Sequence, residues 1–185
     1  MTEETKMKKE KTIYLAGGCF WGTEMVFQSL TGVKETTVGY ANGNPEIKDP
    51  TYQLVCTDTT GYKEAVKVVY DPEKIALSVI LDAYFLCIDP TLKNRQGGDI
   101  GSQYQTGVYT EDGETMREAQ EYFEEEKKKY PVFYTELEPL AVFYEAEEYH
   151  QDYLKKNPGG YCHITKHEME QVRQLDCRNR EEKSL

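Results

Sequence analysis

The segment over residues 12–30 constrains the fold most, because it passes from a strand pattern to a helix pattern across two glycines. Residues 12–16 are rich in side chains that suit a pleated strand. The pair Gly17-Gly18 then lets the backbone turn sharply. Apolar residues recur at helical intervals over residues 20–30. The sequence therefore predicts a strand that leads directly into a helix.

The rest of the chain continues this alternation of strand and helix patterns. Residues 64–70 form the clearest strand, because their side chains alternate between two faces until Asp71-Pro72 ends the run. This order predicts an α+β fold of two layers, with a mixed sheet, a split βαβ, ferredoxin-like core and helices packed on the sheet. Further strands are expected over residues 33–40, 105–110 and 132–142, and helices over residues 51–55, 75–88, 114–129 and 146–156.

Length and composition indicate one globular domain. A chain of 185 residues with 38% hydrophobic content is long enough for one core and short for two. We expect a flexible N-terminal segment over residues 1–10, a single domain over residues 11–160 and a C-terminal segment over residues 161–185. The last segment is polar and weakly periodic, which predicts mobility. The loop over residues 89–102 is long enough to predict a functional role.

The charge and the cysteines narrow the function classes. With 22 basic and 33 acidic residues, the net charge of −11 disfavours nucleic acid or an anionic membrane as a partner. No apolar stretch has the length of a membrane span, and no secretion signal is recognisable, so we expect a cytoplasmic protein. Five cysteines at irregular spacings are untypical of a secreted disulfide framework. They indicate free thiols in a reducing compartment.

Cys19 is the best candidate nucleophile of the chain. It lies at the expected start of the first helix, beside Trp21, which is the only tryptophan. Unpaired backbone N–H groups and the helix dipole favour the thiolate there, and they lower a cysteine pKa from about 8.5 to roughly 3.5–7.5. The sequence therefore predicts an activated thiol within residues 18–22.

The five residues Gly18-Cys19-Phe20-Trp21-Gly22 resemble the signature of the peptide methionine sulfoxide reductase A family, which reduces the S epimer of methionine sulfoxide. The resemblance extends in one order over residues 11–164, and it implies an enzyme that repairs oxidised methionine in proteins and reduces the free amino acid. Four further stretches carry it, over residues 39–43, 50–56, 60–72 and 89–104.

Reduction of a sulfoxide requires a soft nucleophile at sulfur and an acid that protonates the departing oxygen. Cys19 suits the first task. The resemblance selects Glu64 as the acid among 33 carboxylates, and burial in an apolar setting would raise its pKa. The resemblance also implies that Tyr52 and Tyr104 donate hydrogen bonds to the sulfoxide oxygen.

Three further residues complete the binding site that the resemblance implies. Asp99 would support the network that holds the oxygen, and Phe20 and Trp21 would form an apolar wall for the substrate methyl group. Two positions differ from the pattern of many members, since Tyr62-Lys63 replaces histidine-alanine and Ile88 replaces a histidine. Neither position takes part in the scheme.

Attack on the sulfoxide would leave Cys19 as a sulfenic acid, which another thiol must resolve. Cys162 follows the glycine-rich residues 157–160 and is the best candidate, and Cys177 is a possible second relay thiol. The resemblance implies that thioredoxin, or a similar dithiol reductant, reopens the Cys19–Cys162 disulfide. We expect neither a cofactor nor a metal ion.

Other readings stay open at this point. A thiol peroxidase would use Cys19 and Cys162, but the aromatic wall would then have no role. A binding module with an aromatic cage would not explain Cys19 and the glycines around it. A zinc site of Cys162, His163, His167 and Cys177 fits no common finger spacing, and the two histidines can share a solvated helix face.

The remaining cysteines and the third histidine are assigned structural roles. We expect Cys56 and Cys87 to be buried on apolar faces of their elements. We expect His150 to be a helix-surface residue or a satisfied core residue with no catalytic part.

Overall fold

The structure, a computed structural model, describes residues 10–185, so the expected flexible segment over residues 1–10 lies outside it except for Glu10. One sheet contains β1 (Lys11–Ala16), β2 (Val33–Ala41), β3 (Lys63–Tyr70), β6 (Gly107–Thr110), β7 (Glu136–Pro139) and β8 (Phe143–Glu145), and β4 (Arg95–Gln96) pairs with β5 (Asp99–Ile100). The helices are α2 (Phe20–Gln28), α3 (Tyr52–Val55), α4 (Leu77–Cys87), α5 (Gly113–Glu126), α6 (Tyr153–Lys156) and α7 (Lys166–Lys183), with 3-10 turns at Ser102–Tyr104, Lys127–Lys129 and Glu148–His150.

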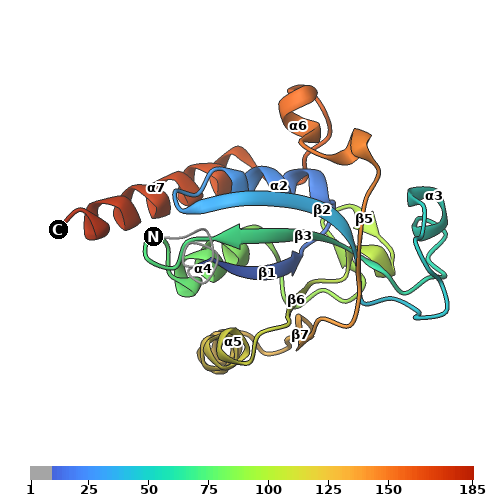
Figure 1. Cartoon of the computed structure of the whole chain (residues 1–185), viewed down its shortest axis with the longest axis horizontal. Helices are drawn as coiled ribbons and strands as arrows, with labels where there is room; N and C mark the ends of the chain where they lie inside the picture. The colour runs from blue at the N-terminus through green and yellow to red at the C-terminus, as the bar shows by residue number, and fades with distance from the viewer. Residues whose placement is uncertain (1–9) are drawn as a thin grey trace, which may run out of the picture.

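The main sheet has the strand order β7-β6-β1-β3-β2-β8 (Figure 1). Its four central strands pair antiparallel, and α2 links β1 to β2 while α4 lies between β3 and β6 in the chain. This βαββαβ order is the split βαβ arrangement. Strand β7 joins β6 in parallel, which makes the six-stranded sheet mixed. The predicted α+β fold with a mixed sheet is confirmed.

The core lies on the face of the sheet that the helices cover. Alternate side chains of a strand point to opposite faces, so Ile13 and Leu15 of β1 enter the main cluster with apolar residues of α2 and α4. Tyr14 and Ala16 point to the other face. There they form a smaller cluster that Leu140 and Phe143, from the β7–β8 region, pack against. Residues 64–70 therefore alternate between two packed faces, which explains their clear pattern.

The C-terminal segment forms an ordered helix, and the prediction of a mobile segment was wrong for its residues 166–183. Thr165 caps α7 in a reciprocal capping box with Glu168. The helix buries Val172 and Leu175 in the main core. The sequence pattern was weak because only a narrow apolar stripe interrupts a charged helix. The expected helix over residues 146–156 was also wrong in part, because it is broken between a 3-10 turn and α6.

Asp176 ties α7 to the turn that follows α2. Its carboxylate accepts hydrogen bonds from the backbone N–H of Thr31 (2.7 Å) and from the Thr31 hydroxyl (3.0 Å). Because hydrogen bonds to a charged group contribute about 1.5–3 kcal/mol, Asp176→Ala should lower the free energy of unfolding by about that amount. Urea titration followed by Trp21 fluorescence measures this free energy.

Glu170→Ala is the control, because it removes only an exposed ion pair with Arg173. It should change the free energy of unfolding by less than about 0.5 kcal/mol. A loss of stability equal to that of Asp176→Ala would contradict this role of Asp176.

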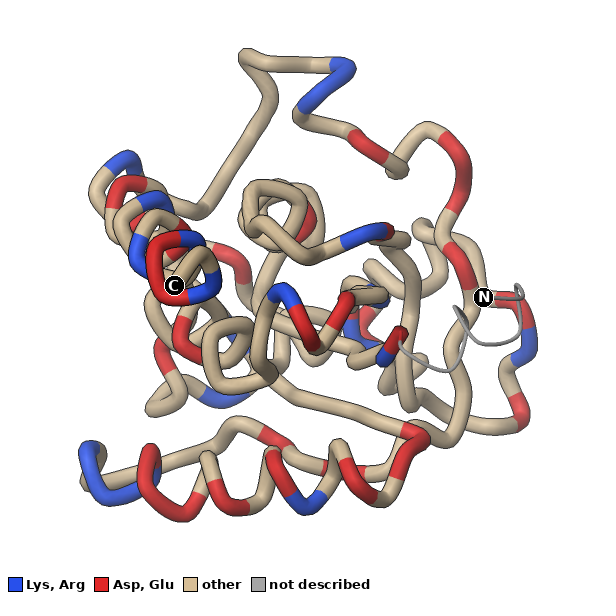
Figure 2. The backbone as a smooth tube through the Cα atoms, turned by 60° about the vertical axis from the view of Figure 1, so that its left-hand side comes forward, with Lys and Arg blue, Asp and Glu red and all other residues tan. Residues whose placement is uncertain are grey.

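Acidic residues predominate along α5, where Arg117 is the one basic residue, whereas acidic and basic residues are mixed along α7 (Figure 2). Among the helices over residues 10–185, none is long and apolar enough to span a membrane.

Candidate active site

Cys19 lies where the sequence predicted it, at the N-cap of α2 directly after the turn from β1. Gly18 supplies the left-handed backbone that this turn needs, with φ of 78°. The Cys19 side chain is only 7% exposed. The thiol therefore sits at the end of a helix but within the protein interior.

The protein environment raises the pKa of Cys19, mainly through burial and next through the negative charge of Glu64. A hydrogen bond from the Trp21 backbone N–H lowers it less. The predicted lowering of this pKa was wrong for the substrate-free protein, because the loss of solvent around the thiol outweighs the end of a nine-residue helix. Cys19 rests as a thiol, and neutralising Glu64 removes the second cause of its raised pKa.

Glu64 is buried in β3 beside the first turn of α2. Its Oε1 accepts a hydrogen bond from the backbone N–H of Phe20 at 3.2 Å. Burial raises the pKa of Glu64 to about 8, against the effect of that hydrogen bond. Within residues 10–185, its buried Oε2 has no hydrogen-bond partner. A neutral carboxyl group with one free oxygen next to a thiol can act as a proton donor.

Two tyrosines and an aspartate from separate elements gather around this carboxyl group. Tyr52 begins α3, and Tyr104 ends the 3-10 turn Ser102–Tyr104. Burial, and then the charge of Glu64, raises the pKa of both hydroxyls, so both are neutral donors near pH 7. Asp99 accepts a hydrogen bond from the Tyr161 hydroxyl (3.0 Å), and its charge acts on both Tyr104 and Glu64.

His150, to which the sequence analysis assigned no role in the site, contacts both residues of the expected aromatic wall. The Trp21 indole N–H donates to Nδ1 of His150 at 3.0 Å, and its ring stacks on Tyr153 at 3.7 Å. The ring of Phe20 lies 5.1 Å from that of His150. His150 is fully buried in a turn, not on a helix surface, and its Nε2 has no partner in the described part of the chain.

Glu147 is a second residue that the sequence analysis missed. Its carboxylate accepts hydrogen bonds from the Tyr40 hydroxyl (2.9 Å) and from the backbone N–H of Tyr52 (3.1 Å). It thereby fixes the start of the helix that carries Tyr52. Glu147 and His150 lie in an irregular turn, so no periodic pattern in the sequence could have marked them.

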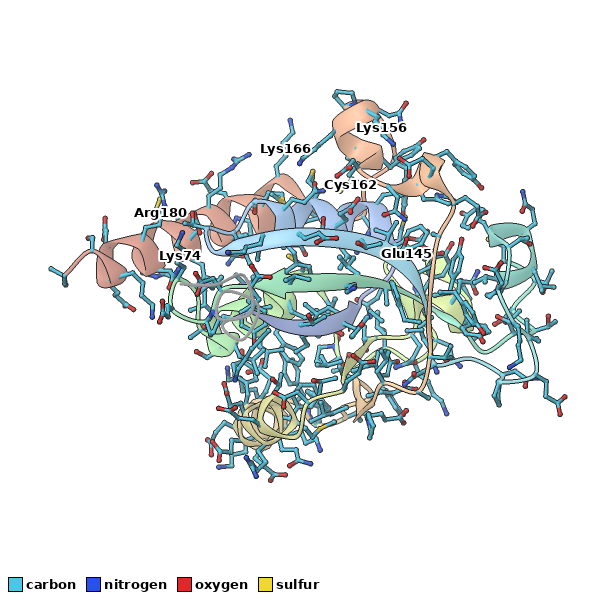
Figure 3. The ribbon with its side chains drawn as sticks, in the orientation of Figure 1. Lys74, Glu145, Lys156, Cys162, Lys166 and Arg180 are labelled. Atoms are coloured by element: carbon cyan, nitrogen blue, oxygen red, sulfur yellow. The ribbon has the colours of Figure 1, made fainter. Side chains whose placement is uncertain are left out.

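Cys162 lies beside α2, on the segment that joins α6 to α7 (Figure 3). A Cβ atom placed on Gly22 would stand 3.0 Å from its sulfur. A negative charge on Cys162 would raise the pKa of Cys19 further, so the two thiols lie within electrostatic range. The structure thus brings the predicted resolving thiol to the first turn of the helix that Cys19 begins.

Cys177 lies away from this group. It is exposed on α7, where its sulfur accepts a hydrogen bond from Arg180 at 3.2 Å. At a rise of about 1.5 Å per residue, it stands about 16 Å along the helix from Lys166. A disulfide requires Cα atoms about 4.4–6.8 Å apart. A bond between Cys162 and Cys177 would therefore require residues 162–165 to leave α2 and fold back along α7, or α7 to unwind.

The predictions for the other cysteines and histidines concerned their burial, and some were confirmed while others were wrong. Cys87 is buried, as expected, but Cys56 is exposed because it ends the short helix α3 at the protein surface. His163 precedes α7 and is largely buried, while His167 is exposed on it, so they do not share a solvated helix face. Across residues 10–185, no three His, Cys, Asp or Glu side chains are grouped so that they could hold a metal ion.

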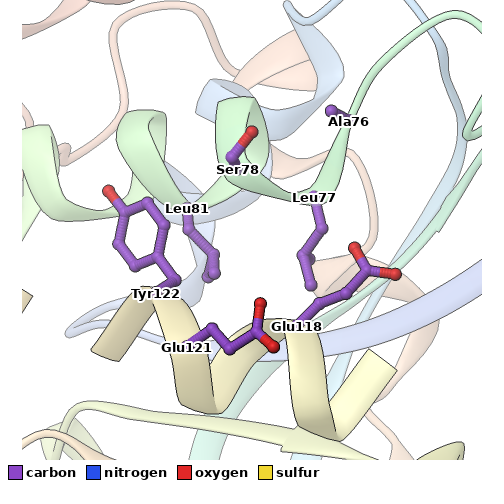
Figure 4. A pocket seen from close by; sticks show the side chains of 7 residues that line it. All are labelled: Ala76, Leu77, Ser78, Leu81, Glu118, Glu121 and Tyr122. Atoms are coloured by element: carbon purple, nitrogen blue, oxygen red, sulfur yellow. The ribbon is translucent and has the colours of Figure 1, made fainter. Parts of the chain in front are cut away.

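A hollow of about 280 Å³ between α4 and α5 lies apart from these residues (Figure 4). Leu77 and Leu81 face Glu118, Glu121 and Tyr122 across it. It contains none of the predicted site residues.

Comparison with known proteins identifies the family. The family model for peptide methionine sulfoxide reductase matches residues 11–181. The peptide methionine sulfoxide reductase MsrA of Clostridium acetobutylicum is 55% identical over 157 residues, which are 84% of this chain and 96% of that protein. The chain belongs to the peptide methionine sulfoxide reductase A family. It is an enzyme of that activity, as the resemblance of its motifs implied.

Solved structures of this reductase family share the fold. The crystal structure of Mxr1 from Saccharomyces cerevisiae in reduced form has a TM-score of 0.81 and 39% identity, and the match covers 85% of this chain and 92% of that one. Methionine sulfoxide reductase A of Corynebacterium diphtheriae has a TM-score of 0.75 and 38% identity, with 83% and 78% covered. Mxr1 in complex with Trx2 has a TM-score of 0.56 and 29% identity, with 79% and 86% covered.

Proposed function

We propose that this reductase acts on the S epimer of methionine sulfoxide, both in proteins and as the free amino acid, and so repairs oxidised proteins. The observation that carries the proposal is the buried carboxyl group of Glu64, which a raised pKa keeps neutral near pH 7, whose Oε2 has no partner among residues 10–185, and which lies within electrostatic range of Cys19. A nucleophile and an acid held together meet the two requirements of sulfoxide reduction.

In the first step the Cys19 sulfur attacks the sulfoxide sulfur while Glu64 gives its proton to the oxygen. The attack joins the two sulfurs. The oxygen then moves to the Cys19 sulfur as its bond to the substrate sulfur and the new S–S bond both break, so methionine leaves and Cys19 carries the hydroxyl group of a sulfenic acid. The thiol proton of Cys19 restores the neutral Glu64, so atoms and charge balance. Protonation of Glu64 also favours ionisation of Cys19, because it removes the charge that raises its pKa.

The neighbouring side chains would bind and orient the substrate. Neutral hydroxyls of Tyr52 and Tyr104 can donate hydrogen bonds to the oxygen as charge develops on it. Asp99 lies within electrostatic range of Tyr104 and supports that network. Phe20 and Trp21 supply the apolar surface for the methyl group. The fixed position of Trp21 against His150 and Tyr153 favours discrimination between the two epimers.

Cys162 would then resolve the sulfenic acid as a Cys19–Cys162 disulfide, which a dithiol reductant of the thioredoxin class reopens by exchange. The position of Cys162 beside α2 supports this role. The relative that was crystallised with Trx2 supports the class of partner. We place Cys177 outside the recycling route, because it is exposed on α7 and its sulfur contacts Arg180. The five free thiols suit a reducing compartment such as the cytoplasm.

One assay tests the proposal against its alternatives. The protein is incubated with dithiothreitol and either epimer of an N-acetylated methionine sulfoxide, or with hydrogen peroxide, and product is measured by chromatography. We expect methionine from the S epimer alone. Turnover of peroxide only would indicate a thiol peroxidase, and binding without turnover would indicate a recognition module; either result would contradict the proposal.

A thiol count tests the recycling route. Without an external reductant, one equivalent of substrate should remove two free thiols from the wild-type protein and from Cys177→Ser, because both retain the resolving thiol. Cys162→Ser should still release one methionine but form no intramolecular disulfide. Alkylation followed by mass spectrometry gives the count. A disulfide that depends on Cys177 and persists without Cys162 would contradict this assignment.

A further inference from the structure

His163, the residue after the resolving Cys162, packs against the first turn of α2. A Cβ atom placed on Gly18 would stand 3.1 Å from its Nε2, and one placed on Gly22 would stand 3.2 Å from its Nδ1. Gly18 immediately precedes Cys19, and Gly22 lies in the turn that follows it. The imidazole ring therefore spans the backbone on both sides of Cys19.

Both ring nitrogens of His163 are buried, and neither has a hydrogen-bond partner among residues 10–185. A buried polar group without a partner is costly, and an apolar ring of similar size would fill the same space without that cost. Packing alone does not account for a histidine at this position.

His163 rests as a neutral imidazole, the form that can accept a proton. Burial lowers the pKa of the His163 ring. The carboxylates of Asp99 and Glu168 and the Gly17 carbonyl raise this pKa, but by less than burial lowers it. The Gly17 carbonyl lies near the ring without the geometry of a hydrogen bond. The ring is thus neutral near pH 7. Burial raises the pKa of the Cys162 thiol, which therefore needs a base to ionise at that pH.

We infer that His163 transfers the proton in the step that joins Cys162 to Cys19, an inference that rests on the proposed function. The Cys162 thiol gives its proton to the imidazole, and its sulfur attacks the sulfur of the Cys19 sulfenic acid. The new S–S bond forms as the S–O bond breaks, and the departing hydroxyl takes the proton from the imidazolium and leaves as water. The Cys19 sulfur is reduced and the Cys162 sulfur is oxidised, so no other reagent is needed.

The test separates the two chemical steps in one experiment. Reduced protein is mixed with excess S epimer without any external thiol, and samples are quenched by alkylation. Chromatography follows methionine, which reports sulfoxide reduction, and mass spectrometry follows the Cys19–Cys162 disulfide. The variants are His163→Gln and His163→Ala, and the matched control is His167→Gln, because His167 is exposed on α7.

We expect the methionine burst to be unchanged in every variant and disulfide formation to slow at least about 10²-fold in both His163 variants, as for loss of an acid-base group. Added imidazole should restore the step in His163→Ala, where a cavity admits it, and not in His163→Gln. The burst amplitude gives the fraction of folded protein, so rates are compared per active molecule.

Three results would overturn the inference or its basis. Disulfide formation at the wild-type rate in both His163 variants excludes proton transfer by His163. A slow step that imidazole fails to restore in His163→Ala assigns the residue to packing alone, which also excludes it. Absence of methionine release from the wild-type protein instead refutes the proposed function.

Discussion

Glu64→Gln should lower the single-turnover rate of methionine formation about 10²- to 10⁴-fold, the range typical for loss of a general acid. Glutamine keeps the size of the side chain and can still accept the hydrogen bond from the Phe20 N–H. It cannot give a proton to the sulfoxide oxygen. In the proposed mechanism Glu64 acts in its protonated form, so the wild-type rate should fall as the pH rises through about 8. The variant should lack that decline.

Glu24→Gln is the matched control for this prediction. Glu24 is also a buried carboxyl group, and burial raises its pKa to about 7. Its carboxyl oxygens accept hydrogen bonds from the Thr36 hydroxyl (3.0 Å) and from the Asp152 backbone N–H (2.8 Å), and neither bond involves Cys19. The variant should form methionine within about twofold of the wild-type rate. Equal losses in both variants would show that burial of a carboxyl group, and not proton donation by Glu64, sets the rate.

Cys19→Ser should abolish methionine formation, with a fall on the order of 10⁶ as found for removal of an enzymatic nucleophile. A serine hydroxyl is nearly the same size but is neither a soft nucleophile nor able to carry the oxygen as a sulfenic acid. Cys177→Ser, which removes an exposed thiol on α7, should keep the wild-type burst. Turnover by Cys19→Ser would exclude the mechanism.

The same thiol gives a second measurement in the substrate-free protein. Because burial raises the pKa of Cys19, iodoacetamide at pH 7 should label the exposed Cys56 and Cys177 before it. Peptide mapping by mass spectrometry gives the order. Fast selective labelling of Cys19 would show that it ionises without substrate, as the helix N-terminus alone would predict.

Local pattern was sufficient for the central fold. The alternation over residues 64–70 and the strand-glycine-helix segment over residues 12–30 both appear as predicted, because each packs on one continuous core. The pattern failed where few side chains are buried. α7 depends on a narrow stripe with Val172 and Leu175, on the tie from Asp176 to Thr31 and on a capping box, and only the capping box is local in the sequence.

Only the site residues that lie within recognisable sequence motifs could be predicted. Cys19 and Glu64 could be named, but the sign of the pKa shift at Cys19 depends on how deeply the helix end is buried, which no local pattern specifies. His150 and Glu147 escaped because they act through contacts with Trp21 and Tyr52, more than 90 residues away in the chain.

The attachment of α7 has a consequence for survival of the enzyme under oxidative stress. Asp176 anchors this helix, and the segment before it holds Cys162 beside α2. A tethered thiol attacks at a high effective concentration, so in the proposed recycling route Cys162 would intercept the sulfenic acid before peroxide converts it irreversibly to sulfinic acid. Loosening the helix should therefore shorten the working life of the enzyme before it slows a single turnover.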